Sequence, residues 1–201
     1  MMFRACLTAV LVVLVNVADA QRPTATYVGG SVMMLDLDGQ RVFVDGPGTG
    51  KFLPREGDIV LHVNGTADGE RVFSPALAGE QLERRSSMVG ESTGVYVYPK
   101  VTPSAGGPHV SYLVQWNGRR MWFCGDTEDA TELLATKDLD AVFLTPAVAA
   151  AVEKAGRSLD ARYVLFYHTT NKEQQDNALS VPCDRCKVSL PWPGEVIQLF
   201  R

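Results

Sequence analysis

The stretch that decides the fold is GRRMWFCGDT, residues 118–127. It follows Asn117, and Asn-Gly is a favoured two-residue turn, so residues 110–116 and 120–124 are predicted to form a β-hairpin. The chain then turns at Gly125 and presents Asp126 at the carboxyl end of the second strand. A carboxylate held by a rigid strand is well placed to bind a metal or to act as a general base. Asp126 is therefore the first candidate functional residue.

The rest of the chain predicts strands first and alternating helices and strands later. Asp38-Gly39 separates the apolar runs 32–37 and 41–45, which predicts a second hairpin, and 58–63 is a continuous apolar run typical of a buried strand. A short helix is expected over 74–82, with Ser74 as its cap and Pro75 at its first position. Further helices are expected over 128–134 and 146–155, and further strands over 26–28, 94–98, 139–144, 161–167 and 196–200. This order predicts an α/β fold in which helices cover two sheets.

Five segments of the chain match one known pattern in order. They are the hairpin 26–47, the strand 58–61, the hairpin 111–127 ending in Gly-Asp-Thr, the helix and strand 133–146, and the strand 164–168. Together they resemble the metallo-β-lactamase superfamily, and within it the branch of ascorbate-phosphate-lactonase-like hydrolases. The resemblance spans roughly residues 26–200 and implies an αββα four-layer sandwich with a site for two metal ions.

The resemblance fails at most of the metal-binding histidines. In that branch one histidine follows the first strand, and three more belong to a Thr-His-x-His-x-Asp-His motif after the apolar strand. The corresponding residues here are Gly30, Asn64, Thr66 and Gly69. The resemblance carries the motif aspartate over to Asp68, the metal-bridging aspartate to Asp126 and the last histidine to His168, while His109 stands near the place of a further histidine. In a eukaryotic source, Asn64-Gly65-Thr66 is also an N-glycosylation acceptor sequence, and a glycan there is incompatible with a working metal cleft.

Two functions follow from this pattern. The lost histidines favour a non-catalytic protein with a binding or scaffold role, no cofactor, and a small molecule as its ligand. The retained residues favour a metal-dependent hydrolase of ester, lactone or phosphoester bonds, because two carboxylates and an imidazole can hold one zinc, manganese or iron ion. In that enzyme the metal ligands are Asp68, Asp126, His168 and His109, and Asp126 and Asp68 take part in catalysis.

Each candidate residue also has a purely structural interpretation. Asp126 is a common type of cap before the helix expected over 128–134, and Asp68 is typical of a turn. His168 at the end of an apolar strand is typical of a hydrogen-bonded core histidine. His109 follows Gly-Gly-Pro, which is typical of an exposed loop, and His62 lies within an apolar strand, where a structural role is expected.

The first twenty residues are predicted to be a signal peptide. Arg4 precedes an apolar run over 5–17, and Ala18-Asp19-Ala20 is a small-x-small cleavage site. Cleavage would leave residues 21–201 as one secreted or periplasmic domain. A membrane anchor is the alternative, but the apolar run is shorter than the ~20 residues that a span requires. The net charge of −4, with acids and bases interspersed, argues against nucleic acid or an anionic membrane as a partner.

Three cysteines remain after that cleavage. In an oxidising compartment, the C-x-x-C spacing of Cys183 and Cys186 predicts a small disulfide loop, which leaves Cys124 free. Two free thiols, half of a zinc site and a redox pair are the alternatives for the same spacing.

Overall fold

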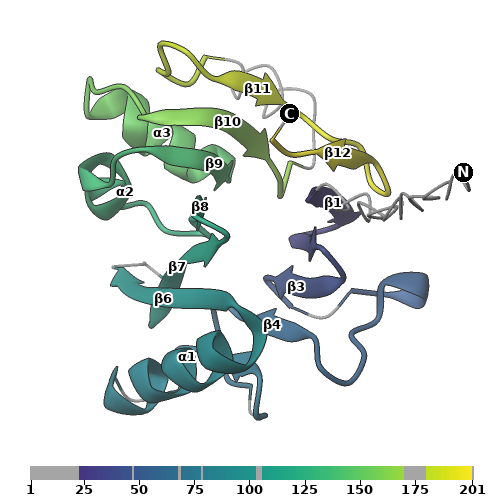
Figure 1. Ribbon diagram of the computed structural model, residues 1–201. Coiled ribbons are helices and arrows are strands. Elements are labelled where there is room, and N and C mark those ends of the chain that lie inside the picture. The colour runs from purple at the N-terminus through teal and green to yellow at the C-terminus, as the bar shows by residue number, and fades with distance from the viewer. Residues whose placement is uncertain are drawn as a thin grey trace, which may run out of the picture.

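The computed structural model describes residues 23–46, 48–67, 69–77, 79–102, 106–169 and 180–200. These residues form two mixed β-sheets that face each other, with helices flanking them (Figure 1). The predicted α/β sandwich is therefore confirmed. The predicted signal peptide over residues 1–20 lies outside the described residues.

The first sheet has the strand order β12-β1-β2-β3-β4-β5. Its strands are β1 (Thr24–Gly29), β2 (Val32–Leu37), β3 (Gln40–Val44), β4 (Ile59–Leu61), β5 (Val72–Phe73) and β12 (Val196–Gln198). Strands β12, β1, β2 and β3 pair antiparallel, and β3, β4 and β5 pair parallel. Asp38 and Gly39 form the expected turn between β2 and β3, with φ angles of 57° and 89°. Asp-Gly adopts this left-handed conformation readily, which explains why the sequence predicted the hairpin.

The second sheet has the order β11-β10-β9-β8-β7-β6. Its strands are β6 (Val95–Thr102), β7 (His109–Trp116), β8 (Arg119–Phe123), β9 (Leu139–Leu144), β10 (Ala161–Phe166) and β11 (Lys187–Ser189). Strands β6 to β8 pair antiparallel and β8 to β11 pair parallel. The predicted hairpin at Asn117-Gly118 is confirmed, with φ angles of 45° and 74°. Because β8, β9 and β10 are parallel, their carboxyl ends lie together at one end of the sheet.

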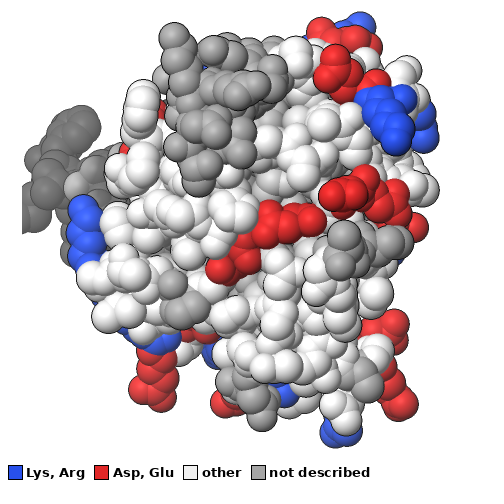
Figure 2. All heavy atoms as spheres, turned by 180° about the vertical axis from the view of Figure 1, so that it is seen from behind, with Lys and Arg blue, Asp and Glu red and all other residues white. Residues whose placement is uncertain are grey.

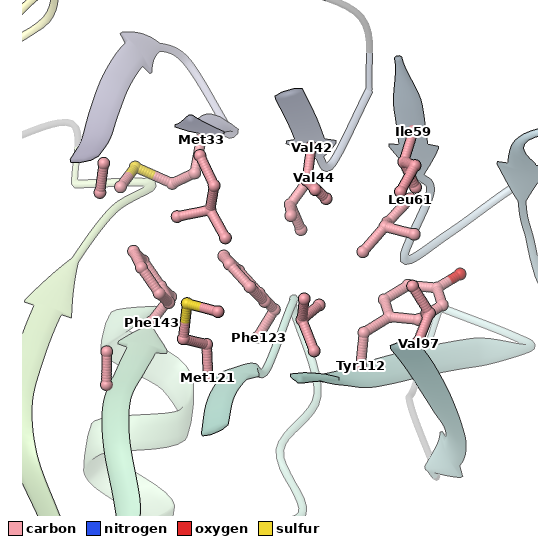
Figure 3. Close-up of a cluster of buried hydrophobic side chains, with 14 of the residues drawn as sticks. Met33, Val42, Val44, Ile59, Leu61, Val97, Tyr112, Met121, Phe123 and Phe143 are labelled. Carbon is pink, nitrogen blue, oxygen red and sulfur yellow. The ribbon is translucent and has the colours of Figure 1, made fainter. Parts of the chain in front are cut away.

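The main hydrophobic core lies between the two sheets. Figure 3 shows side chains from β2, β3 and β4 pointing toward side chains from β6, β7, β8 and β9. Phe123 and Phe143 stack with their ring centroids 4.2 Å apart. Burial of these apolar surfaces supplies the main driving force that holds the two sheets together.

Three helices flank the two sheets, and the first of them adds Leu82 and Val89 to the main core. The helices are α1 (Gly79–Thr93), α2 (Thr131–Ala135) and α3 (Pro146–Lys154). A second hydrophobic cluster joins α2 and α3 to the outer face of the second sheet and includes Leu134, Val152 and Trp122. Helix α1 contacts the edge strand β6. On the outer face of the first sheet, Phe43 packs with Phe52 of the 3-10 turn η1 (Gly50–Phe52).

The helix predicted over 74–82 is wrong in position. Ser74 is fully buried, and its hydroxyl donates a hydrogen bond to the carbonyl of Ala67 at 2.9 Å. The hydroxyl is therefore not available as a helix cap, and the helix begins later, at Gly79.

The short strands β5 and β11 were also not predicted, because two or three residues carry too little alternation to be recognised.

The described surface carries mixed charge. On the face seen in Figure 2, the Lys and Arg atoms lie mainly near the outline, and Asp and Glu atoms run across the middle. Within the ranges that the structure describes, no helix has the length and apolar character needed to cross a bilayer.

Candidate functional site

Asp126 is fixed by the sharp turn that follows β8. Gly125 has a φ angle of 64°, and its N–H donates to the Tyr167 hydroxyl at 3.0 Å. Its carbonyl accepts a hydrogen bond from the Thr145 hydroxyl at 3.1 Å. A Cβ atom at position 125 would overlap the Nε2 atom of His109, so only glycine fits. The residues that follow β9 and β10 therefore hold the turn, and the turn fixes the position of Asp126.

His168 lies directly beside this carboxylate. It follows β10 with a φ angle of 60°, and its Nδ1 atom lies 2.8 Å from Asp126 Oδ1. The hydrogen bond to Asp126 raises the pKa of His168, and the same bond lowers the pKa of Asp126. Side-chain exposure is 36% for His168 and 39% for Asp126, so the pair is reached by solvent. When His168 is protonated, it forms a charge-assisted hydrogen bond with the Asp126 carboxylate.

The helix-cap interpretation of Asp126 is wrong. Helix α2 begins at Thr131, and Asp126 Oδ1 is paired with His168 Nδ1. Instead, Asp129 Oδ1 accepts the Thr131 N–H at 2.9 Å. Asp126 is thus directed toward His168 and away from the helix.

His109 is the first residue of β7 and is fully buried. Its Nδ1 atom lies 2.6 Å from the Thr102 hydroxyl oxygen, and burial lowers the pKa of the imidazole. The interpretation of His109 as an exposed loop residue is therefore wrong. Its Nε2 atom is buried and has no hydrogen-bond partner in the described part of the chain. That atom faces Gly125, next to Asp126.

Asp45 joins the same cluster from the first sheet, and the sequence analysis did not select it. It follows β3 with a φ angle of 69°, and its Oδ2 atom is buried without a partner among the described residues. Burial, followed by repulsion from Asp126, raises the pKa of Asp45 to about 7. Its position after a strand in Asp-Gly-Pro was the available signal, because it matches that of Asp126 after β8.

Two positions where the resemblance expects histidines offer no imidazole. Asn64 and Thr66 are exposed, and the backbone of Asn64 forms an isolated bridge with His109. His62 is half-buried, and its carbonyl accepts a hydrogen bond from the Tyr112 hydroxyl at 2.7 Å. Asp68, which was predicted as a metal ligand and catalytic residue, lies outside the described residues.

The described residues of this group are not arranged as a two-metal centre. Across the ranges that the structure describes, no group of three or more His, Cys, Asp or Glu side chains is arranged to hold a metal ion. A hydrolytic zinc site needs about three protein ligands. The single-ion combination of Asp68 with Asp126 and His168 stays a prediction.

The C-x-x-C sequence forms a disulfide between Cys183 and Cys186. Cys124 is free and buried, and burial raises the pKa of its thiol. The disulfide occupies both sulfurs of the C-x-x-C sequence, so this form of the protein has no free thiol pair there to bind zinc.

Comparisons with known proteins identify the fold by structure alone. No family model matches the sequence, and no curated protein matches it. The metallo-β-lactamase-fold protein YhfI of Bacillus subtilis is 9% identical with a TM-score of 0.60, and the match covers 87% of this chain and 99% of that one. A metallo hydrolase of Ignicoccus hospitalis is 14% identical with a TM-score of 0.52, over 88% of this chain and 98% of its own. An isothiocyanate hydrolase from Delia radicum gut bacteria is 11% identical with a TM-score of 0.52, over 88% and 99%.

Identities this low show a shared fold and leave the activity open. They do not show that the chain belongs to the ascorbate-phosphate-lactonase-like branch, so that assignment stays a prediction. The two mixed sheets, the helices that flank them and the solved structures agree with the pattern of five segments. The chain has the metallo-β-lactamase fold.

Proposed function

We propose that this protein binds a small polar ligand at the Asp126 cluster and does not hydrolyse it. The observation that carries the proposal is that Asp45 Oδ2 and His109 Nε2 are buried without a hydrogen-bond partner among the described residues. They interact electrostatically with Asp126, which lies 2.8 Å from His168. We define the Asp126 cluster as Asp45, His109, Asp126 and His168.

The lost histidines explain the proposed lack of hydrolysis. Hydrolases with metal ions lower the pKa of a bound water and use it as the nucleophile. The positions that would supply histidine nitrogens carry Asn64 and Thr66, and neither side chain is a good zinc ligand. The retained residues Asp126 and His168 therefore lie together without enough nitrogen ligands for two ions.

Unsatisfied polar atoms support ligand binding at the same cluster. Asp45 Oδ2 and His109 Nε2 are both buried, and no described residue offers either of them a hydrogen bond. Leaving a buried polar group unpaired costs about 1–3 kcal/mol, so such groups in folded proteins have a specific reason. A small polar ligand that forms a hydrogen bond with either atom would remove that cost.

The second candidate function is a hydrolase with a single metal ion. It is favoured by the central place of Asp126, which lies beside His168 and interacts electrostatically with both His109 and Asp45. Asp68 and His109 would complete the ligand set for zinc, manganese or iron. Several solved proteins with this fold carry the name of hydrolase, such as the isothiocyanate hydrolase.

Metal content distinguishes these two functions. The processed protein, purified without a histidine tag and exposed to zinc, manganese and iron, is measured by mass spectrometry of the metals. We expect far less than one ion per chain, and equal values for the wild type and His168→Ala. About one tightly held ion per chain that disappears in His168→Ala, but not in the control His62→Ala, would overturn the proposal.

A hydrolysis assay adds a second test. Ester, lactone and phosphoester substrates are offered to the wild type and to Asp126→Asn. We expect no turnover above background in either protein. Turnover that Asp126→Asn abolishes would establish the single-metal hydrolase, whereas turnover that Asp126→Asn leaves unchanged would come from another site or a contaminant.

We also propose that the protein is secreted or periplasmic. The support is the sequence of residues 1–20, with its apolar run and its small-x-small cleavage site. The mass of the intact exported protein is expected to match a chain that begins at Gln21. A mass that retains the first twenty residues would contradict cleavage.

A further inference from the structure

A group of basic residues gathers at the amino ends of the parallel strands in the second sheet. Arg119 begins β8, Arg162 is the second residue of β10, and Lys187 begins β11. Asp126 and His168 follow the carboxyl ends of β8 and β10. The basic group and the Asp126 cluster therefore lie at opposite ends of the same strands.

These basic side chains line one small cavity. Its volume is about 330 Å³, and its lining residues are Arg119, Arg162, Tyr163, Arg185, Cys186, Lys187 and Phe200. Four of the seven carry a positive charge at neutral pH, and none carries a negative charge. A cavity of one sign focuses its field and attracts ions of the opposite sign. We name it the arginine cavity.

Aromatic contacts hold one wall of the arginine cavity in place. The Arg119 guanidinium lies over the Phe200 ring, 5.0 Å from its centroid. The Tyr163 ring meets the Phe200 ring edge to face, with centroids 6.1 Å apart. A guanidinium stacked on an aromatic ring loses less rotamer freedom when it binds a ligand.

A single carboxylate orients two of the guanidinium groups. Asp140 Oδ1 lies 2.9 Å from Arg119 Nη1 and 3.4 Å from Arg162 Nη1. The other oxygen of Asp140 accepts the backbone N–H of Arg120 at 2.9 Å. One negative charge therefore faces two positive charges, and this arrangement leaves excess positive charge beside the cavity.

The disulfide restricts the segment that carries Arg185. Cys183 and Cys186 enclose Asp184 and Arg185 in a closed loop, and Asp184 accepts a hydrogen bond from the Ser158 hydroxyl at 3.1 Å. A closed loop has fewer conformations than an open one. Arg185 is thus kept near Arg119 and Arg162 even though it is exposed.

The adjoining cavity is a poorer place for an anion. It has a volume of about 550 Å³ and shares Arg119, Arg162 and Arg185 with the arginine cavity. It also contains three carboxylates, from Asp138, Asp140 and Asp160. Their charge nearly balances that of its arginines, so an anion gains more in the smaller cavity.

From this arrangement we infer that the arginine cavity binds the phosphoryl group of a small anionic ligand. Guanidinium groups suit phosphoryl oxygens because they offer paired N–H donors in a planar fork, and lysine adds a point charge. The volume of about 330 Å³ suits a compact ligand. A nucleic acid is a poor match, because a polymer needs a basic stripe along several phosphates.

Inorganic pyrophosphate is the probe for this inference. It is titrated calorimetrically into the processed, full-domain protein at about 20 mM and about 150 mM salt, since exposed charges are screened more strongly at the higher salt. Affinity should fall as salt rises, because Arg162 has 70% of its side chain exposed. The double variant Arg162→Gln with Arg185→Gln should bind at least tenfold more weakly, which corresponds to about 1.4 kcal/mol.

Arg84→Gln is the matched control. Arg84 is an exposed residue of α1, which contacts β6 at the opposite edge of the sheet from β11. The control should bind pyrophosphate as the wild type does, and all three proteins should share one melting temperature. An equal loss of binding in the control, or full binding in the double variant, would overturn the inference.

Vesicles distinguish two sources of the phosphoryl group. Binding of pyrophosphate without binding to phosphatidylglycerol vesicles supports a free phosphorylated molecule as the ligand. Binding to both supports a lipid headgroup as the source. Binding to neither overturns the inference and leaves the Asp126 proposal untouched, because the two sites share no residue.

Discussion

Asp45 offers the sharpest test of the electrostatics at the candidate site. Its Oδ2 atom is buried and has no hydrogen-bond partner among the described residues, and the ionised Asp126 carboxylate acts on it. Both effects favour the protonated acid in the folded state. The substitution Asp45→Asn removes the titration and keeps the size of the side chain. Asparagine also tolerates the φ angle of 69° at this position.

The expected gain follows from linkage between protonation and folding. A rise of the Asp45 pKa from 3.8 to about 7 corresponds to about 4 kcal/mol of free energy of unfolding. Between these two pKa values the folded wild type keeps a proton that the unfolded chain releases. Stability of the wild type therefore falls with rising pH across this window, by about 1.4 kcal/mol per pH unit from this group.

Urea unfolding from pH 4 to pH 9 measures the effect. The stability of Asp45→Asn relative to the wild type should rise from pH 4 to pH 7 and then stay constant. Asp38→Asn is the control, because Asp38 is an exposed turn residue with a φ angle of 57°. The control reports any benefit of asparagine in this backbone conformation. A stability difference for Asp45→Asn that does not change with pH would refute the reasoning.

Three further substitutions test the contacts around Asp126. Gly125→Ala should lower the free energy of unfolding by at least about 2 kcal/mol, since its Cβ overlaps His109 and its φ angle is 64°; urea unfolding measures the loss. Thr102→Val should cost about 1–3 kcal/mol in the same assay, because it leaves both ring nitrogens of buried His109 unpaired. His168→Gln should lower stability by less than about 1 kcal/mol, since the pair with Asp126 is more than one-third exposed. That loss should appear below pH 6.5 and vanish as the pH rises through the raised pKa of His168.

The hairpins were predictable because the relevant interactions are local. Asp38-Gly39 and Asn117-Gly118 both adopt left-handed angles that few other residue pairs accept without strain. Strand β9 was predictable for a similar reason, since all six of its residues are buried and its sequence is almost entirely apolar. The signal for each of these elements lies within its own short stretch of sequence.

Tertiary contacts decided the elements that were predicted wrongly. Ser74 is a favoured helix cap by residue type, but its hydroxyl is bonded to the Ala67 backbone in the fold. His109 follows Gly-Gly-Pro and was expected in a loop, yet β7 begins at this residue and buries it against Thr102. In both cases a partner seven positions away determined the role of a residue whose immediate neighbours suggested another.

The arginine cavity also depends on tertiary contacts that cannot be recognised in the sequence. The sequence has no basic run, and its four cationic residues are spread from position 119 to position 187. Three parallel strands bring them together, and the pairing of β10 with β11 places Tyr163 opposite Lys187. A scan for charged stretches finds nothing here, because the charge accumulates across the sheet and not along the chain.

The difference between lost and retained residues at the candidate site has a physical explanation. Asn64, Thr66 and Gly30, at three of the four lost histidine positions, are exposed, so a change there disturbs no packing. Asp126 and His168 differ, because removing either one leaves the other without its hydrogen-bond partner. In this fold, exchange of an exposed residue at those positions therefore costs little packing, whereas exchange of Asp126 or His168 removes a hydrogen bond worth less than about 1 kcal/mol. Retention of Asp126 and His168 is thus weak evidence for hydrolysis, and the buried unpaired atoms of Asp45 and His109 are better evidence for a ligand.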